Sequence, residues 1–321
     1  MGKYILRRLL QQIPIMLGVS ILVFSIIQLA PGDPLASYMQ NPNMTIAQME
    51  ALKEAYGLNA SPVQQYFSYM KNALKGEFGY SIQLKQPVSK LIAERLGATF
   101  FIAFGSLLIS ILIAIPVGVI SATKQYSFID YAGTIFALAG ISIPIFFFAI
   151  LMKKWFAIDL RWFPLSGFVS PGKNYVGINM IKDILNHSFL PLIVLGLAGA
   201  GSLMRYTRSS MLEVIRQDYV RTARAKGLKE RVVIYKHALR NALIPVITLL
   251  GFTLPGLFSG AITTEIMFSL PGMGRLQYNA VLHRDYPIMM GTNLFLAIFT
   301  LIGNLLADIS YAAVDPRIRL D

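Results

Sequence analysis

The 321-residue chain contains no cysteine, and its three histidines, His187, His237 and His283, lie far apart in the sequence. Disulfide bonds and thiolate metal sites are therefore excluded, and no histidine pair has the short spacing of a zinc site. Charged residues are also scarce: they make up 14% of the chain, whereas about 25% is usual in soluble domains. Hydrophobic residues make up 55%. This composition indicates a protein that spans a membrane.

Acidic residues are outnumbered by basic ones. The chain has 16 Asp and Glu against 29 Lys and Arg, which gives a formal charge of +13. An excess of this size can indicate nucleic-acid binding. Here the basic residues gather between apolar runs, as they do in membrane proteins whose cytoplasmic loops are rich in Lys and Arg. We therefore predict a lipid bilayer, and no nucleic acid, as the surroundings of this chain.

Six apolar stretches approach or exceed the roughly 20 residues that a membrane span requires. The first follows basic residues, as a signal peptide does, but no small-residue cleavage site follows it, so we predict an uncleaved span. The density of Lys and Arg places both termini on the cytoplasmic side. The fold class predicted is an all-α polytopic membrane protein with six transmembrane helices. The stretches are Ile13–Ala30, Phe100–Ala122, Tyr131–Met152, Phe189–Tyr206, Leu243–Phe268 and Met289–Val314.

Residues 31–98 are predicted to form a small helical insertion on the extracytoplasmic side, between the first and second spans. Thr45 and Gln48 have the spacing of a capping box for a helix that ends at Gly57. A second helix begins at Ser61, with Pro62 as its first residue, and closes at Gly76. The insertion is thus expected to be folded rather than a plain loop.

The stretch Pro87–Leu96 has its apolar residues on one helical face, which favours a helix lying on the bilayer before the second span. The chain then divides into residues 1–30, the N-terminus with the first span; residues 31–98, the insertion; and residues 99–321, the transmembrane core. A polar loop at 207–243 separates the fourth and fifth spans.

Glycines crowd the fourth span at Gly196, Gly199 and Gly201. Small residues allow helices to approach closely. The partner helix can belong to the same chain or to another subunit, and the sequence leaves both open.

One segment comes close to a phosphate-binding loop. Gly167–Asn174 nearly matches the pattern GxxxxGK[ST], but it ends in Asn, which removes the hydroxyl that holds magnesium. Pro171 also removes an amide that would contact phosphate. We therefore interpret the segment as a turn and predict neither a nucleotide site nor catalytic residues in this chain.

Two carboxylates lie inside predicted spans, where charge is costly and usually faces protein or a cavity. Glu265, near the outer end of the fifth span, either lines a gate or substrate path or binds amides or an Arg of the following loop. Phe268 and Met273 follow it and are gate candidates with it. Asp308, one turn after Asn304, is interpreted with that residue as structural and paired with a basic residue of the inner loops.

The most informative stretch is Asp218–Pro245. Between Arg205 and Arg240 there are ten Lys and Arg but three acids. We predict two short helices joined at Gly227, with Asp218 as the N-cap of the first and Gly227 in a left-handed conformation after its end. The alternative is a basic loop that only sets topology.

This stretch resembles the EAA loop of bacterial ABC-importer permeases in the dipeptide, oligopeptide and nickel branch. That branch typically reads Y-V/I-RTARAKGL followed by HALRNA-L/I-P, which Tyr219–Pro245 follows closely. Arg221 and Thr222 stand where the general motif has Glu-Ala, so the role of that glutamate does not carry over. Further similarities are APGDP at Ala30–Pro34 and PVSKLIAERL at Pro87–Leu96.

The resemblance implies the first of two homologous permease subunits in the bacterial inner membrane. Its partners would be the second permease, two ABC ATPase subunits that carry ATP and magnesium, and an extracytoplasmic binding protein. Peptides are the expected substrate, with nickel complexes, glutathione or oligosaccharides as alternatives. An ion-coupled secondary transporter or a membrane enzyme would need repeats or catalytic clusters that the sequence lacks. The residues expected to dock on the ATPases are Asp218, Tyr219, Arg221, Ala223, Lys226, Gly227 and Leu228.

Overall fold

The computed structural model describes residues 2–33, 35, 38, 44–253, 255–259 and 261–314. Within these residues the regular secondary structure is helical apart from one isolated β-bridge between Tyr80 and Pro87, and turns and irregular loops connect the helices. Among the described residues, five helices are long and apolar enough to cross a membrane, and the number is six if a sharply bent pair counts as one span. The predicted polytopic helical architecture is therefore confirmed.

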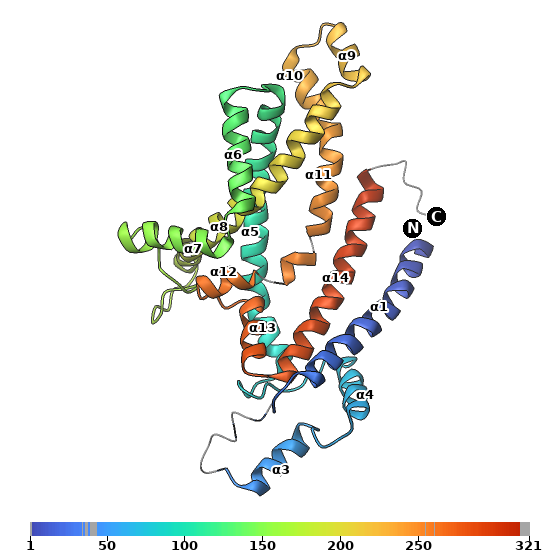
Figure 1. The fold of residues 1–321 in the computed structure, drawn as a ribbon, viewed down its shortest axis with the longest axis vertical. Helices are drawn as coiled ribbons and strands as arrows, with labels where there is room; N and C mark the ends of the chain where they lie inside the picture. Colours follow the sequence, from blue (N-terminus) through green and yellow to red (C-terminus); the bar gives the residue numbers. More distant parts are fainter. Residues whose placement is uncertain are drawn as a thin grey trace.

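The long helices form an elongated bundle with α9 at one end and α3 at the other (Figure 1). Helices α5, α6, α8 and α11 reach the end that carries α9, while α1 and α14 run side by side along the flank. The bounds of the helices, including the π and 3-10 segments labelled η, are α1 Gly2–Leu29, α3 Ile46–Ala55, α4 Pro62–Ala73, α5 Val88–Thr123, α6 Phe128–Ser142, α7 Ile145–Met152, η1 Lys153–Asp159, α8 Ile178–Ile215, α9 Asp218–Ala225, α10 Glu230–Val232, η2 Val233–Ala238, α11 Leu239–Thr253, η3 Pro255–Phe258, α12 Ile262–Met267, α13 Met273–Leu282 and α14 Tyr286–Val314.

The two capped helices of the insertion are present as predicted. The side chains of Thr45 and Ser61 each accept a hydrogen bond from the backbone amide three residues on. In both cases the Gln side chain at that later position accepts from the backbone amide of the cap residue. Gly57 and Gly76 follow the two helices with positive φ angles of 67° and 83°. Glycine tolerates this conformation without a steric cost, which explains where both helices end.

The prediction of a separate surface helix at Pro87–Leu96 is wrong. These residues form the first turns of α5, which continues without a break to Thr123. The apolar face that suggested contact with lipid instead packs against protein, because α13 and the start of α14 lie beside it. The buried residues in this contact are Val88, Leu91, Ile92, Met273, Leu276, Ala280 and Ile288.

The third predicted span, Tyr131–Met152, is not a single helix. Helix α6 ends at Ser142, and the next helical segment, Ile145–Asp159, is bent by 106° from it. Ile143 has an extended backbone because it precedes Pro144, which disfavours the helical conformation at the residue before it. Helix α7 therefore points away from the side of the bundle (Figure 1).

Two further spans differ from their predicted bounds. The fifth, Leu243–Phe268, is interrupted: α11 ends at Thr253, and η3 and α12 follow as short separate pieces. Pro255 and Gly256 lie at this interruption, and both are poor residues for a helix interior. The fourth, predicted as Phe189–Tyr206, is only the middle of α8, which continues to Ile215.

The glycines of α8 serve packing within this chain. A Cβ atom on Gly196 would lie 2.6 Å from the side chain of Ile109, and one on Gly199 would lie 2.6 Å from Ser110 Oγ. Ser110 Oγ also donates to the Gly196 carbonyl at 2.8 Å, a bond that the close approach of α5 and α8 permits. This contact forms the centre of the bundle.

Candidate functional site

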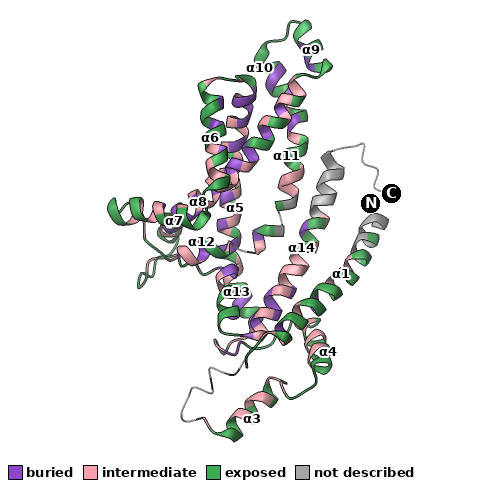
Figure 2. Cartoon of the chain, viewed as in Figure 1, coloured by how far each residue is buried: buried purple, intermediate pink, exposed green. Residues whose placement is uncertain are grey.

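The predicted pair of short helices forms a projection at one end of the bundle, here called the elbow and comprising residues 218–238. Helix α9 turns at Gly227 into α10 and η2, which lead directly into α11. The elbow projects beyond the ends of α5 and α6, and its outer face is largely exposed (Figures 1 and 2). A surface of this kind is accessible to another protein.

The inner face of the elbow is anchored by an apolar cluster. Val220 and Ala223 of α9 are 0% and 5% exposed. They pack with η2 and with the ends of α5 and α8, so the elbow is fixed to the bundle rather than loosely tethered. The buried members of the cluster are Val119, Ala122, Met211, Val220, Ala223, Val233, Ile234, Ala238 and Ala242.

The turn between the two arms of the elbow has defined geometry. Gly227 has φ +74°, and its amide donates to the Arg224 carbonyl at 2.9 Å. Arg224 also closes the turn from outside, since its Nη2 lies 2.8 Å from Glu230 Oε1. This contact raises the pKa of the Arg224 guanidinium, which therefore stays charged. The predicted left-handed glycine is confirmed.

The predicted cap of α9 is wrong by one residue. Gln217 has the extended backbone of an N-cap, and Asp218 is the first helical residue. The Asp218 side chain forms no cap hydrogen bond, but it lies 3.4 Å from Arg221 on the exposed face. Its charge still lies at the positive end of the helix dipole.

The structure separates the seven predicted docking residues into two groups. Ala223 is buried and belongs to the anchor. The other six are exposed on the elbow, and the exposed fractions of Tyr219 and Leu228 are 43% and 41%. The exposed group consists of Asp218, Tyr219, Arg221, Lys226, Gly227 and Leu228.

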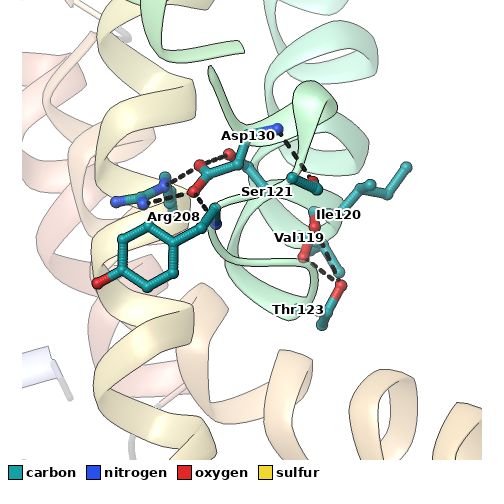
Figure 3. Close-up of polar contacts among 8 residues, drawn as sticks. Val119, Ile120, Ser121, Thr123, Asp130 and Arg208 are labelled. Carbon is teal, nitrogen blue, oxygen red and sulfur yellow. Dashed lines mark hydrogen bonds and ion pairs between the residues drawn. The ribbon is translucent and has the colours of Figure 1, made fainter. Parts of the chain in front are cut away.

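A buried ion pair near the elbow was not predicted. The Asp130 side chain, 5% exposed, accepts from Arg208 Nε at 2.7 Å and from Arg208 Nη2 at 3.0 Å. Ser121 Oγ and the amide of Tyr126 also donate to this carboxylate (Figure 3). The ion pair therefore joins α5, α6 and α8 just before the elbow.

The sequence gave only a weak indication that Asp130 has a structural role. It lies in the first turn of α6, three residues after Ser127, and both residue types are common at helix starts. Its partner lies 78 positions later. Pairing them required knowledge of how α6 and α8 pack, which periodicity within one helix does not supply.

A second buried carboxylate lies toward the opposite end of the bundle. Glu265 of α12 is 2% exposed and accepts from Thr99 Oγ1 at 3.0 Å and from the amide of Arg275 at 2.8 Å. Thr99 in turn accepts from the amide of Met273 at 2.8 Å. Glu265 thus satisfies amides at the start of α13, which is the second of the two interpretations that the sequence left open.

The two other gate candidates are enclosed. Phe268 and Met273 are each 1% exposed. Lys153 Nζ lies 5.6 Å from the centre of the Phe268 ring and donates to the Met267 carbonyl at 2.6 Å. Met273 belongs to the apolar contact between α5, α13 and α14. In this conformation the candidates hold helices together and do not line an open path.

The residues predicted to be structural lie on α14. Asn304 is exposed. Asp308 lies farther along the same helix, and its side chain is outside the described part of the structure. Its predicted basic partner therefore stays a prediction.

The segment Gly167–Asn174, which nearly matches the phosphate-loop pattern, forms an irregular loop. Gly167 and Gly172 have positive φ angles, and Ser170 is held by two hydrogen bonds to Asp183. Across residues 44–253 and the other described segments, no three His, Cys, Asp or Glu side chains are grouped as metal ligands.

The sequence matches known protein families over most of its length. Residues 114–320 match the family of binding-protein-dependent transport system inner membrane components, and residues 1–103 match the family of their N-terminal regions. The chain belongs to this family. The match covers both the insertion and the elbow.

Relatives are similar over their full length. The chain is 44% identical over 320 residues to the oligopeptide transport system permease protein AppB of Bacillus subtilis, covering 99% of this chain and 100% of that protein. It is 44% identical over 323 residues to a putative peptide permease protein of Brucella suis, covering 100% of both. It is 40% identical over 336 residues to the dipeptide transport system permease protein DppB of Alkalihalophilus pseudofirmus, covering 99% and 100%.

Proposed function

We propose that this chain is a permease subunit of an ATP-driven importer that takes up peptides. Family membership carries the transport role, because the family consists of inner membrane components of binding-protein-dependent systems. The relatives named for oligopeptide and dipeptide transport support peptides over nickel complexes, glutathione or oligosaccharides.

In this proposal the elbow is the surface that ATPase subunits grip, and it faces the cytoplasm. This proposal is supported by the fact that some residues of the elbow are buried and anchor it, while others are exposed. Val220 and Ala223 anchor it in the bundle, while Tyr219, Arg221 and Leu228 present an exposed mixture of aromatic, cationic and apolar groups. Aromatic residues and Arg are enriched at the centre of protein interfaces.

The assembly would contain a second, homologous permease, two ATPase subunits that bind ATP and magnesium, and an extracytoplasmic binding protein. Both chain termini would lie in the cytoplasm. The described ends of α1 and α14 point toward the elbow side of the bundle, which agrees with that orientation (Figure 1).

The proposed mechanism follows from the anchoring. When the ATPases close on ATP, they move the elbow, and its apolar cluster transmits the movement to α5 and α8. The Asp130–Arg208 ion pair joins α6 to the same unit. The chain therefore contributes movement and a path, and the ATPases contribute the chemistry.

The test is to replace Tyr219 or Leu228 with Ala, co-express the chain with its ATPase subunits, and measure both co-purification and peptide uptake. An interface anchor of this type contributes enough that binding should weaken about tenfold or more. Tyr80→Ala, an exposed tyrosine outside the elbow, is the matched control and should retain both activities. Normal ATPase binding and uptake in both elbow variants would exclude the docking role.

A further inference from the structure

A second polar feature lies at the end of the bundle opposite the elbow, in a pocket between the start of α5 and α13. Its volume is about 480 Å³, which lies within the usual range of small-molecule sites. Its polar lining residues include Gln83, Arg95, Arg275, Asn279, His283 and Asp285.

The two arginines in this pocket are unusual neighbours. Arg95 and Arg275 are half-buried and line the same pocket, where two like charges repel each other. Arg95 donates to the Leu91 carbonyl at 2.9 Å and lies 3.6 Å from Glu94. The Arg275 guanidinium has no hydrogen bond or ion pair with any described residue.

The acid that lines the pocket is already engaged elsewhere. Asp285 is 1% exposed and accepts from Ser81 Oγ at 2.5 Å and from the amide of Gln83 at 3.0 Å. The amide of Ile288 lies 3.3 Å from its other oxygen. Asp285 therefore holds the loop before α5 against α14, and no ion pair joins it to either arginine within the described chain.

The position of Arg275 is fixed by hydrogen bonds to the backbone at the start of α13. Its own backbone amide donates to Glu265 Oε2 at 2.8 Å. It lies in the first turn of α13, whose start is also held by Thr99 through Met273. The buried Glu265 junction thus places Arg275 at the pocket, although the Glu265 side chain does not line it.

We propose that Arg95 and Arg275 bind the terminal carboxylate of the transported peptide in this pocket. A guanidinium presents a planar set of donors that matches the two oxygens of a carboxylate. One carboxylate between the two arginines would offset their mutual repulsion and give Arg275 the partner that it lacks. The inference rests on the proposed peptide function.

The terminal carboxylate suits a transporter that carries many peptides. Every unmodified peptide has this group, whatever its side chains. A site that binds the terminal carboxylate holds the substrate whatever the amino-acid sequence of the peptide. Asn279 and His283 also line the pocket and can form hydrogen bonds with the adjacent peptide group. The pocket lies on the face that, in the proposed orientation, receives substrate from the binding protein.

The experiment uses the assembled permease pair with its ATPases in lipid nanodiscs, without the binding protein. Binding of tri-alanine and of tri-alanine amide is measured by calorimetry. We expect the wild type to bind the free acid about tenfold or more tightly than the amide, which is the scale of one charge-assisted contact. Arg275→Gln and Arg95→Gln should reduce this preference to less than about twofold.

Matched variants separate charge from geometry and from folding. Arg275→Lys keeps the charge but loses the planar fork, so an intermediate preference is expected. Arg284→Gln removes an exposed arginine nearby that does not line the pocket, and it should keep the full preference. Each variant is used only after its unfolding midpoint and ATPase co-purification match those of the wild type; Arg275→Lys replaces Arg275→Gln if the latter fails to fold.

The outcomes for this inference and for the proposed function are distinct. Equal binding of acid and amide by the wild type, or an unchanged preference in Arg275→Gln or its Lys replacement, overturns the carboxylate site. A defect that appears only when the binding protein is added also overturns it, because the arginines would then contact that protein. Failure of the wild type to take up peptides with its binding protein present instead overturns the peptide function itself.

Discussion

Two buried carboxylates, at two junctions of the bundle, are stabilised in different ways. Asp130, near the elbow, is paired with the guanidinium of Arg208 and joins α5, α6 and α8. Glu265, near the opposite end, has no cationic partner among the described residues and binds the hydroxyl of Thr99 and amides of α13. Both helices that carry these acids are short or interrupted.

The two junctions differ in which parts of the structure they hold together. An ion pair between two helices resists their separation strongly, because parting them would leave charges buried and unpaired. A carboxylate bound by amides fixes a local turn instead, and it leaves the neighbouring arginine free for another anion. The elbow end thus joins whole helices to one another, as the proposed mechanism requires, and the other end positions side chains at one turn.

Asp130→Ala should have the largest effect. It leaves Arg208 without its carboxylate in a mostly buried site, and breaking such a pair costs about 3 kcal/mol or more in the free energy of unfolding. The measurement is the unfolding midpoint of the purified chain in detergent. Asp218→Ala, which breaks an exposed pair with Arg221, is the control and should leave the midpoint unchanged. Equal midpoints for wild type and Asp130→Ala would mean that the ion pair does not hold the junction.

Glu265→Gln should cost less, about 2 kcal/mol. The amide keeps one acceptor oxygen, but its NH₂ group then faces either the Arg275 amide or the Thr99 hydroxyl, and that donor loses its acceptor. The same midpoint measurement applies, and proteolysis near α13 should become faster. A variant as stable as the wild type would show that the amides of α13 find other partners.

Gly272→Ala tests the Glu265 junction from the other side. A Cβ at this position would lie 2.2 Å from the Glu265 carboxyl carbon, so the acid must move, at a cost of about 1–2 kcal/mol. Gly97→Ala is the matched control, since no atom lies within 4 Å of its Cβ and alanine favours a helix. A loss of stability in Gly97→Ala but none in Gly272→Ala would reverse this interpretation.

Gly227→Val should have the smallest effect on stability and a larger one on function. Space is available at this site, but φ is +74°, which strains a β-branched residue by about 1–2 kcal/mol. Gly227→Asn tolerates this conformation better and serves as control. We expect peptide uptake and ATPase co-purification to fall in the Val variant and to be largely kept in the Asn variant. Similar uptake by both would show that the turn geometry does not matter.

The sequence predicted local features well and contacts between distant elements poorly. The capping boxes at Thr45 and Ser61 and the left-handed Gly227 follow from residues within one turn, and all three are confirmed. The class of the fold followed from composition and from the length of the apolar runs.

The errors arose where tertiary packing decides the outcome. An apolar face at Pro87–Leu96 indicates burial, but the sequence cannot say whether lipid or α13 covers it. Apolar runs also continued across Pro144 and Pro255, so length alone suggested unbroken spans where the backbone breaks. Arg275 and Thr99 gave no signal because their roles depend on elements far apart in the chain.

Helix α8 has 38 residues and runs without interruption from Ile178 to Ile215, directly before the elbow. At 1.5 Å per residue it is about 57 Å long, nearly twice the thickness of the hydrocarbon core of a bilayer. A tilt of about 5° of a helix of this length displaces one end relative to the other by about 5 Å. If the proposed ATPase subunits rotate the elbow by a small angle, the far end of α8 would therefore move by a distance comparable to the width of a peptide backbone.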